Sequence, residues 1–124
     1  MGKYEIPVGS WPEFLDGFSR EHEGTPVTMV VMAPDRGQQV EARDLPLGGV
    51  TADLRQPPGA IVVVVGRRPG AHLTHHITAP TSVTVEETEE GAHQALRIVS
   101  NAGEETVVRF RVAVESEERD IFFQ

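Results

Sequence analysis

Ala60-Ile61-Val62-Val63-Val64-Val65-Gly66 is the stretch that decides the fold. Its branched apolar residues leave no polar face to turn towards water, and the stretch is too short for a helix of ordinary length. Breakers bound it on both sides, with Pro57-Pro58-Gly59 before it and several glycines after it. We therefore expect a central strand that is buried on both faces, with the rest of the chain as its cover.

The length and charge of the chain set limits on its class. Its 124 residues are the size of one domain, which buries about two thirds of the surface that the unfolded chain exposes. We expect one globular domain over residues 1–114, followed by an acidic tail, 115–124, with an apolar end. The net charge of −8 repels phosphate backbones and anionic lipids. Neither nucleic acid nor a membrane surface is an expected partner.

The chain contains no cysteine, which excludes disulfides, thiol catalysis and thiolate metal sites. Its first ten residues lack an apolar run of signal-peptide length. No segment approaches the ~20 apolar residues of a membrane span. A cytoplasmic location is therefore the expectation.

An N-terminal helix is predicted to begin at Ser10-Trp11-Pro12-Glu13, where Ser10 and Glu13 have the spacing of a reciprocal capping pair. The helix is expected to end by Gly24. One apolar stripe runs along it, formed by residues at positions i, i+3, i+4 and i+7: Trp11, Phe14, Leu15 and Phe18. A stripe of this kind usually packs on a sheet.

From Pro26 onward the helical period disappears, and short segments with a period of two alternate with turn residues. Two half-exposed strands are predicted on either side of a bend at Leu45-Pro46-Leu47-Gly48-Gly49. The predicted fold class is mainly β (α+β). We expect the N-terminal amphipathic helix to pack on a bent antiparallel sheet, or on a small barrel, of about seven strands.

Three histidines form the densest cluster of chemically able side chains: His72, His75 and His76. On a strand, His75 faces one side, while His72 and His76 face the other and lie about 13 Å apart at ~3.3 Å per residue. A zinc ion needs its ligand nitrogens within about 2.1 Å. These histidines are metal candidates only if a bulge or a ligand from a neighbouring strand brings donors together. Otherwise His75 is expected to lie beside the core with its imidazole hydrogen-bonded to a backbone carbonyl.

No other pattern of catalysis or cofactor binding stands out. No serine lies in a Gly-x-Ser-x-Gly elbow, and no Gly-rich loop joins a strand to a following helix. Asp53 is expected to point outward, and the acidic run from Glu86 to Glu90 is interpreted as a solvated face that pairs with Arg97 or Arg111. The sequence therefore predicts no catalytic residue and no cofactor.

Several short blocks together resemble a bacterial family, the domain of unknown function 5335. The resemblance extends from the helix to about Val114, and the blocks that carry it are Trp11-Pro12-Glu13-Phe14, Phe18-Ser19-Arg20, His22-Glu23-Gly24, Val40–Leu47 and His72-Leu73-Thr74-His75. The family is one without an assigned activity. The resemblance therefore implies a single small bacterial domain and transfers no site residue.

These observations favour a non-enzymatic β domain that acts in protein interaction or self-association. The tail supports this hypothesis, because Ile121, Phe122 and Phe123 are large apolar residues at a free terminus and could add to an exposed strand edge of a second copy. The alternative is a metal-binding or ligand-binding small barrel, or an enzyme, centred on His72, His75 and His76.

Overall fold

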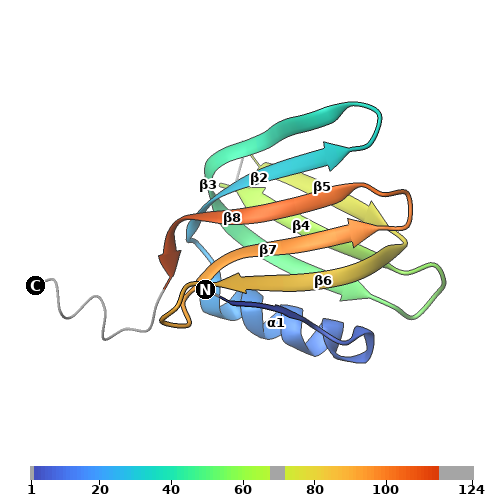
Figure 1. Ribbon diagram of the computed structural model, residues 1–124, viewed down its shortest axis with the longest axis horizontal. Helices are drawn as coiled ribbons and strands as arrows, with labels where there is room; N and C mark the ends of the chain where they lie inside the picture. The colour runs from blue at the N-terminus through green and yellow to red at the C-terminus, as the bar shows by residue number, and fades with distance from the viewer. Residues whose placement is uncertain (1, 68–71, 115–124) are drawn as a thin grey trace, which may run out of the picture.

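An antiparallel sheet and one α-helix make up the part of the chain that the computed structural model describes, residues 2–67 and 72–114 (Figure 1). The sheet has eight strands in the order β1-β6-β7-β8-β2-β3-β4-β5. The elements, in chain order, are β1 (Gly2–Glu5), a 3-10 turn (Val8–Ser10), α1 (Trp11–His22), β2 (Pro26–Ala33), β3 (Gly37–Asp53), β4 (Ala60–Gly66), β5 (His72–Thr78), β6 (Pro80–Glu87), β7 (His93–Ser100) and β8 (Glu105–Val114). The predicted fold class is confirmed.

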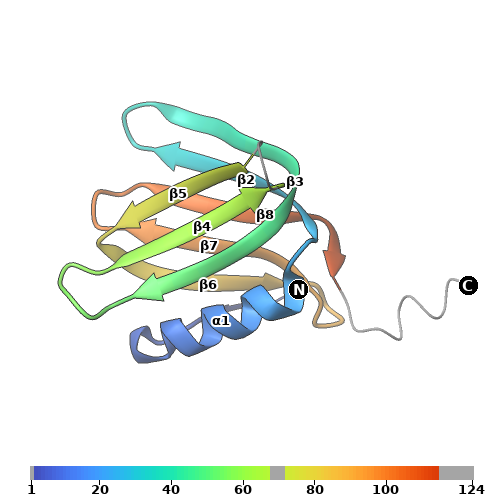
Figure 2. The same ribbon diagram turned by 180° about the vertical axis from the view of Figure 1, so that it is seen from behind.

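Strand β3 bends the sheet because it changes partner along its 17 residues. Its first part pairs with β2, where Leu45 lies opposite Val27. Its last part pairs with β4, where Leu47 lies opposite Val65. The chain therefore does not stop between two strands at residues 45–49, as the sequence predicted. Instead, one strand passes through register shifts and crosses from one layer to the other (Figure 2).

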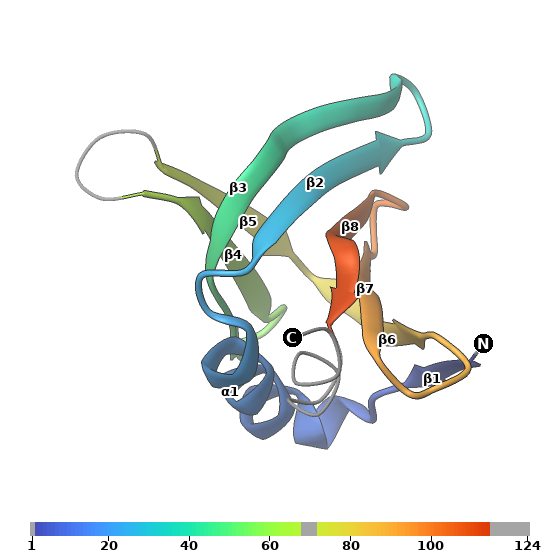
Figure 3. The same ribbon diagram turned by 90° about the vertical axis from the view of Figure 1, so that its left-hand side faces the viewer.

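The bent sheet is not closed into a barrel: among the described residues, its two edge strands, β1 and β5, do not pair with each other. The last part of β3 forms one layer with β4 and β5, and its first part joins β2, β8, β7 and β6 in the other (Figures 2 and 3). Strand β1, which the sequence did not predict, pairs with β6, where Tyr4 lies opposite Val85.

Strand β4 is central in its layer, since it pairs with both β3 and β5. Ile61, Val63 and Val65 are fully buried. Val62 and Val64, on the opposite face, are only half-buried. The expectation of burial on both faces is therefore wrong for the outer face, because α1 and the second layer cover the inner face alone.

Helix α1 lies at the rim where the two layers separate (Figure 3). Trp11, Leu15 and Phe18 are buried in the same apolar cluster as residues of β4, β6 and β8, while Phe14 is partly buried against it. The Ser19 hydroxyl anchors the helix to β3, because it accepts a 2.7 Å hydrogen bond from the Val50 amide. Within the described residues, no helix is long and apolar enough to cross a membrane.

The predicted capping pair at the start of α1 is wrong. Ser10 precedes the helix, but its side chain makes no capping hydrogen bond. Ser10 ends the 3-10 turn with nearly helical backbone angles, φ −97° and ψ −3°, and its amide donates to Pro7 O. The turn leads the chain directly into the helix, so a side-chain cap is not required.

Candidate functional site

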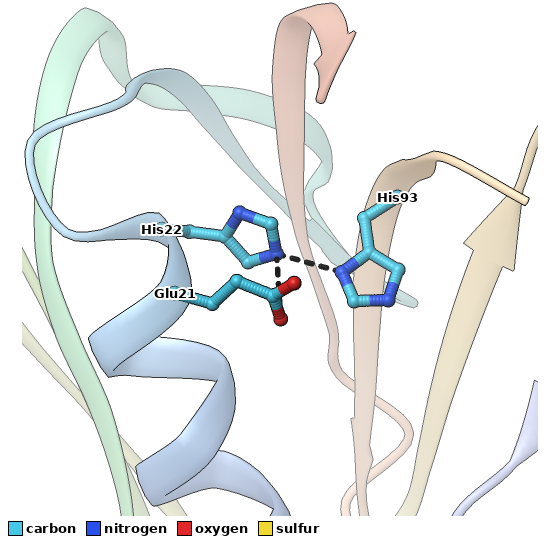
Figure 4. Close-up of side chains that lie close together, drawn as sticks. All are labelled: Glu21, His22 and His93. Carbon is cyan, nitrogen blue, oxygen red and sulfur yellow. Dashed lines mark hydrogen bonds and ion pairs between the residues drawn. The ribbon is translucent and has the colours of Figure 1, made fainter. Parts of the chain in front are cut away.

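Two histidines that are distant in the sequence meet where α1 ends and β7 begins (Figure 4). His22 Nε2 lies 2.7 Å from His93 Nδ1, which is hydrogen-bond distance. The Glu21 carboxylate lies on the same side, with its Oε1 3.7 Å from His22 Nε2. One ligand atom from each of the three residues lies within 4.8 Å of the other two. We call Glu21, His22 and His93 the His22–His93 site.

The end of α1 fixes the position of His22. The Thr25 amide donates to His22 O, and the Gly24 amide donates to Leu47 O of β3. Gly24 has a φ of +88°, a left-handed conformation that glycine adopts without steric cost and that commonly ends helices. The chain therefore leaves the helix directly after His22 and joins the sheet.

The turn between β6 and β7 fixes the position of His93. Thr88 and Ala92 close this turn with two hydrogen bonds, from Thr88 N to Ala92 O and from Ala92 N to Thr88 Oγ1. The register of β7 against β8 shifts between His93 and Ala95. Irregular pairing of this kind changes the direction of side chains at the ends of a sheet. Beside this shift, the His93 ring faces α1 (Figure 4).

Aromatic rings surround the histidine pair. The Phe18 ring meets His22 edge-on with a centroid distance of 4.6 Å and stacks on His93 at 5.5 Å. Phe110 lies 4.8 Å from His22 on another side. The His22 side chain is 1% exposed. The nitrogens of His22 therefore lie in a largely apolar, low-dielectric environment, where an unpaired polar group is costly.

The surroundings select one tautomer of the pair. Nδ1 of His22 is buried and has no hydrogen-bond partner among the described residues, so a proton at that atom would be an unsatisfied donor. On the far side of His93, Nε2 lies 3.9 Å from Glu87 Oε2, where an N–H is favoured. Both conditions are met when His22 Nε2–H donates to His93 Nδ1 and His93 carries its proton on Nε2.

The site holds His22 neutral. The pKa of His22 is lowered from 6.5 to about 4, mainly by burial and secondly by the neighbouring His93, while Glu21 acts in the opposite direction. At neutral pH the contact between Glu21 and His22 is therefore not an ion pair. Tyr4 is a second polar neighbour of Glu87, besides His93. Burial and the Glu87 carboxylate raise the pKa of Tyr4. A neutral imidazole with an available lone pair is the form that binds metals.

The geometry of the three side chains is close to that of a metal centre. Two nitrogens that share a tetrahedral ion at about 2.0–2.1 Å lie about 3.3 Å apart, whereas His22 Nε2 and His93 Nδ1 are 2.7 Å apart. A small rotation of His93, whose side chain is 17% exposed, would supply the difference. Glu21 is 63% exposed and is free to move closer.

The histidines predicted from the sequence lie elsewhere, on β5. His72 and His76 are exposed, and His75 is half-buried on the same face as Leu73 and Ile77, which confirms the predicted alternation. His75 Nε2 lies 3.1 Å from the Thr106 hydroxyl rather than from a backbone carbonyl. Among the described residues, no group of three metal-ligating atoms within 4.8 Å includes His72, His75 or His76.

Other predicted positions have varied outcomes. Asp53 is exposed as expected and pairs with Arg55 at 2.9 Å. In the acidic run, Glu86 is 17% exposed and pairs with Arg97 at 2.9 Å, as expected, while Glu87 is 25% exposed and faces His93. The interpretation of this run as a solvated face is therefore wrong for Glu86 and Glu87. The tail residues Ile121, Phe122 and Phe123 lie outside the described residues.

The sequence did contain one signal for the His22–His93 site. His22 continues the buried stripe of α1, since Trp11, Leu15, Phe18 and His22 follow the spacing of one helix face and are all buried. A polar residue on an apolar stripe needs a partner. The partner, however, is 71 positions away, and no local pattern connects them.

A sequence model of a family of unknown function, DUF5335, matches residues 3–119. The chain belongs to this family. The resemblance noted from the sequence is thereby confirmed. This family member is also similar to an uncharacterized protein from Aquifex aeolicus (strain VF5), with 27% identity over 114 residues that cover 92% of this chain and 96% of that protein. No solved structure matches the chain.

Proposed function

We propose that this domain binds a divalent transition-metal ion of the zinc type at the His22–His93 site. The observation that carries the proposal is the convergence of three ligand atoms, from Glu21, His22 and His93, within 4.8 Å. Imidazole nitrogens favour zinc, copper, nickel and iron over calcium and magnesium, which prefer oxygen ligands. Two histidines and one carboxylate leave a fourth position for water or another ligand.

The residue behind His93 supports the proposal. Metal-bound histidines usually donate their second ring N–H to a carboxylate, which orients the ring and makes the ligand nitrogen more basic. Glu87 occupies this place, because its Oε2 lies 3.9 Å from His93 Nε2 while His93 Nδ1 faces His22. The tautomer that the apo site selects is thus the one in which His93 offers its Nδ1 lone pair to a metal.

The same geometry limits the affinity. Metal binding breaks the hydrogen bond between the two histidines, which costs about 0.5–1.5 kcal/mol. It also moves the His22 proton to the buried Nδ1, which has no partner among the described residues, at a further cost of about 1–3 kcal/mol. Since only three protein ligands offset these costs, we expect micromolar affinity, weaker than that of a four-ligand structural zinc site.

Calorimetric titration of zinc into protein purified without a histidine tag tests the proposal. We expect one ion per chain and a rise in melting temperature, because the ion binds only the folded state. His93→Gln and Glu21→Gln should each weaken binding at least tenfold, and Glu87→Gln should weaken it through the orientation of His93. His22 is left intact in these variants because it is part of the core.

A matched control separates this site from the one predicted on β5. The double variant His72→Ala, His76→Ala removes two exposed histidines and should bind zinc like the unmodified chain. If zinc binding disappears in this control, the metal belongs to β5 and the proposal is wrong. If neither the unmodified chain nor any variant binds zinc, His22 and His93 form only a structural hydrogen-bonded pair, and the proposal is again contradicted.

A role in protein association, expected from the sequence, is a second proposal. The observation that favours it is the open edge of β5, which pairs with β4 but has no strand on its other side among residues 2–67 and 72–114. This proposal does not depend on the metal site.

A further inference from the structure

The two edges of the sheet differ in how they are protected. Strand β1 is four residues long and carries Lys3 and Glu5. Strand β5 is seven residues long and contains no acidic or basic residue other than histidine, no proline and no glycine. Natural proteins usually protect strand edges by shortness, charge, proline or bulges. Of these devices β1 has two, whereas β5 has none.

The pairing of β5 with β4 is regular over its whole length. Seven consecutive pairs run from Gly66 opposite His72 to Ala60 opposite Thr78, without a register shift. Within the part of the chain that the structure describes, the other side of β5 therefore presents an even row of unpaired backbone donors and acceptors. Such a row is a template for another strand.

We propose that the edge of β5 pairs with β5 of a second copy in an antiparallel, two-fold symmetric contact centred on His75. This inference is independent of the proposed metal binding; it rests on the proposed association at the β5 edge and assigns it one partner and one register. The sequence of β5 fits itself in this register. Leu73 then lies opposite Ile77 of the second copy on the inner face, and Thr74 lies opposite His76 of the second copy on the outer face.

Both faces of the paired strands would match. Leu73 is only partly buried within one chain, so an apolar neighbour from the second copy removes more of its surface from water. On the outer face, Thr74 and His76 are exposed, and a hydroxyl opposite an imidazole allows a cross-strand hydrogen bond. Each of these pairs occurs twice, once from each copy, as a two-fold symmetric interface requires.

Charge also favours a second copy at this edge over other parts of the surface. The chain carries a net charge of −8, so most contacts between two copies bring acidic residues together and are repelled. Strand β5 lacks acidic residues. An edge without acidic residues on an acidic domain is a place where two copies approach without this repulsion.

Sedimentation equilibrium of the full chain over a concentration series, with a chelator present, tests the pairing. We expect a reversible dimer. The double variant Thr74→Lys, His76→Lys places like charges directly opposite each other across the proposed contact and should raise the dimer dissociation constant at least tenfold. The variant Gln38→Lys, Gln39→Lys adds the same charge at exposed positions of β3 and should leave the dimer intact.

A charge exchange tests both the occupant and the register. Copies with Thr74→Glu and His76→Glu should not dimerise with themselves, but should form a mixed dimer with the lysine copies, because each lysine then faces a glutamate. A chain that stays monomeric up to about 1 mM, or a dimer that the lysine variant leaves unchanged, overturns the proposal. So does a dimer that Ile121→Ser, Phe123→Ser dissociates, since the tail would then form the contact.

Discussion

The two groups of histidines in this protein differ in how the chain brings them together. His72, His75 and His76 are adjacent in the sequence, but a strand separates their rings onto opposite faces, with His72 and His76 exposed. His22 and His93 are 71 positions apart, yet their ring nitrogens lie 2.7 Å from each other. Adjacency in a sequence is therefore a weak guide to a site on a strand, where consecutive side chains point apart.

The groups differ in their surroundings as well. The His22–His93 pair lies among Phe18 and Phe110, where each polar contact has a large effect on stability. On β5, water competes for the exposed imidazoles, and the contact of His75 with Thr106 is the one hydrogen bond recorded for its ring among the described residues. We expect changes at the first group to alter stability and changes at the second to alter it little.

The largest expected effect comes from Phe18, which packs on both rings of the first group. Phe18→Ala should lower the free energy of unfolding by about 3–5 kcal/mol, because it leaves a cavity in the core. Phe14→Ala, at a half-buried position of the same helix, should cost clearly less. Urea denaturation measures both. Equal losses would show that the buried stripe does not depend on the packing around the histidine pair.

A fall in pH should lower the stability of the folded chain through His22. In metal-free protein with a chelator, His22 stays neutral in the folded state down to about pH 4, whereas in the unfolded chain it takes up a proton near its ordinary pKa of 6.5. Unfolding therefore becomes easier as the pH falls from about 6.5 to about 4, by at most about 3 kcal/mol, and then levels off.

Carboxylates also titrate in the lower part of this pH range. The contribution of His22 is therefore measured as the difference in pH dependence between a His22 variant and the unmodified chain. The His22→Gln variant should lose less stability between pH 6.5 and 4 than the unmodified chain, while His72→Ala should lose the same amount. Denaturation curves at a series of pH values give both slopes. If His22→Gln and the unmodified chain have the same slope, His22 is not the group that resists protonation.

A smaller effect is expected when one partner of a histidine hydrogen bond is removed. His93→Ala leaves the buried Nε2–H of His22 without an acceptor and should cost about 1–3 kcal/mol. His75→Ala removes the contact with the Thr106 hydroxyl and should cost about 0.5–1.5 kcal/mol. A loss for His75→Ala that exceeds the loss for His93→Ala would reverse the comparison between the two groups.

The smallest effect is expected at the exposed histidines of β5. His72→Ala and His76→Ala should each change the free energy of unfolding by less than about 0.5 kcal/mol, as is usual for surface positions. The measurement belongs at low protein concentration, where association does not contribute. A larger loss would mean that these rings have contacts within one chain.

The parts of the fold that the sequence predicted are those that local patterns determine. The stripe of α1, the apolar run of β4 and the alternation on β5 all follow from spacings of two to four residues. Strand β1 was missed because Gly2-Lys3-Tyr4-Glu5 has little strand character by itself, and pairing with β6 holds it. The passage of β3 through Pro46 and two glycines was missed because its partners on both sides decide it.

The site was missed for a related reason. Each of its residues has an ordinary local role, since His22 ends a helix, His93 begins a strand and Glu21 is a surface carboxylate. Their combined chemistry arises only when α1 packs on the bent sheet. In the sequence, only a histidine on the buried stripe of α1 indicates that such a partner exists.

Strand β3 links the two layers covalently, and this affects how the domain comes apart. Its first part is hydrogen-bonded to β2, and its last part to β4, within a single stretch of 17 residues. The Ser19 hydroxyl ties α1 to Val50 in the same strand. Loss of either layer would leave one side of β3 unpaired and would also release the helix. The amides of β2, β3 and β4 should therefore exchange with solvent as one cooperative unit rather than layer by layer.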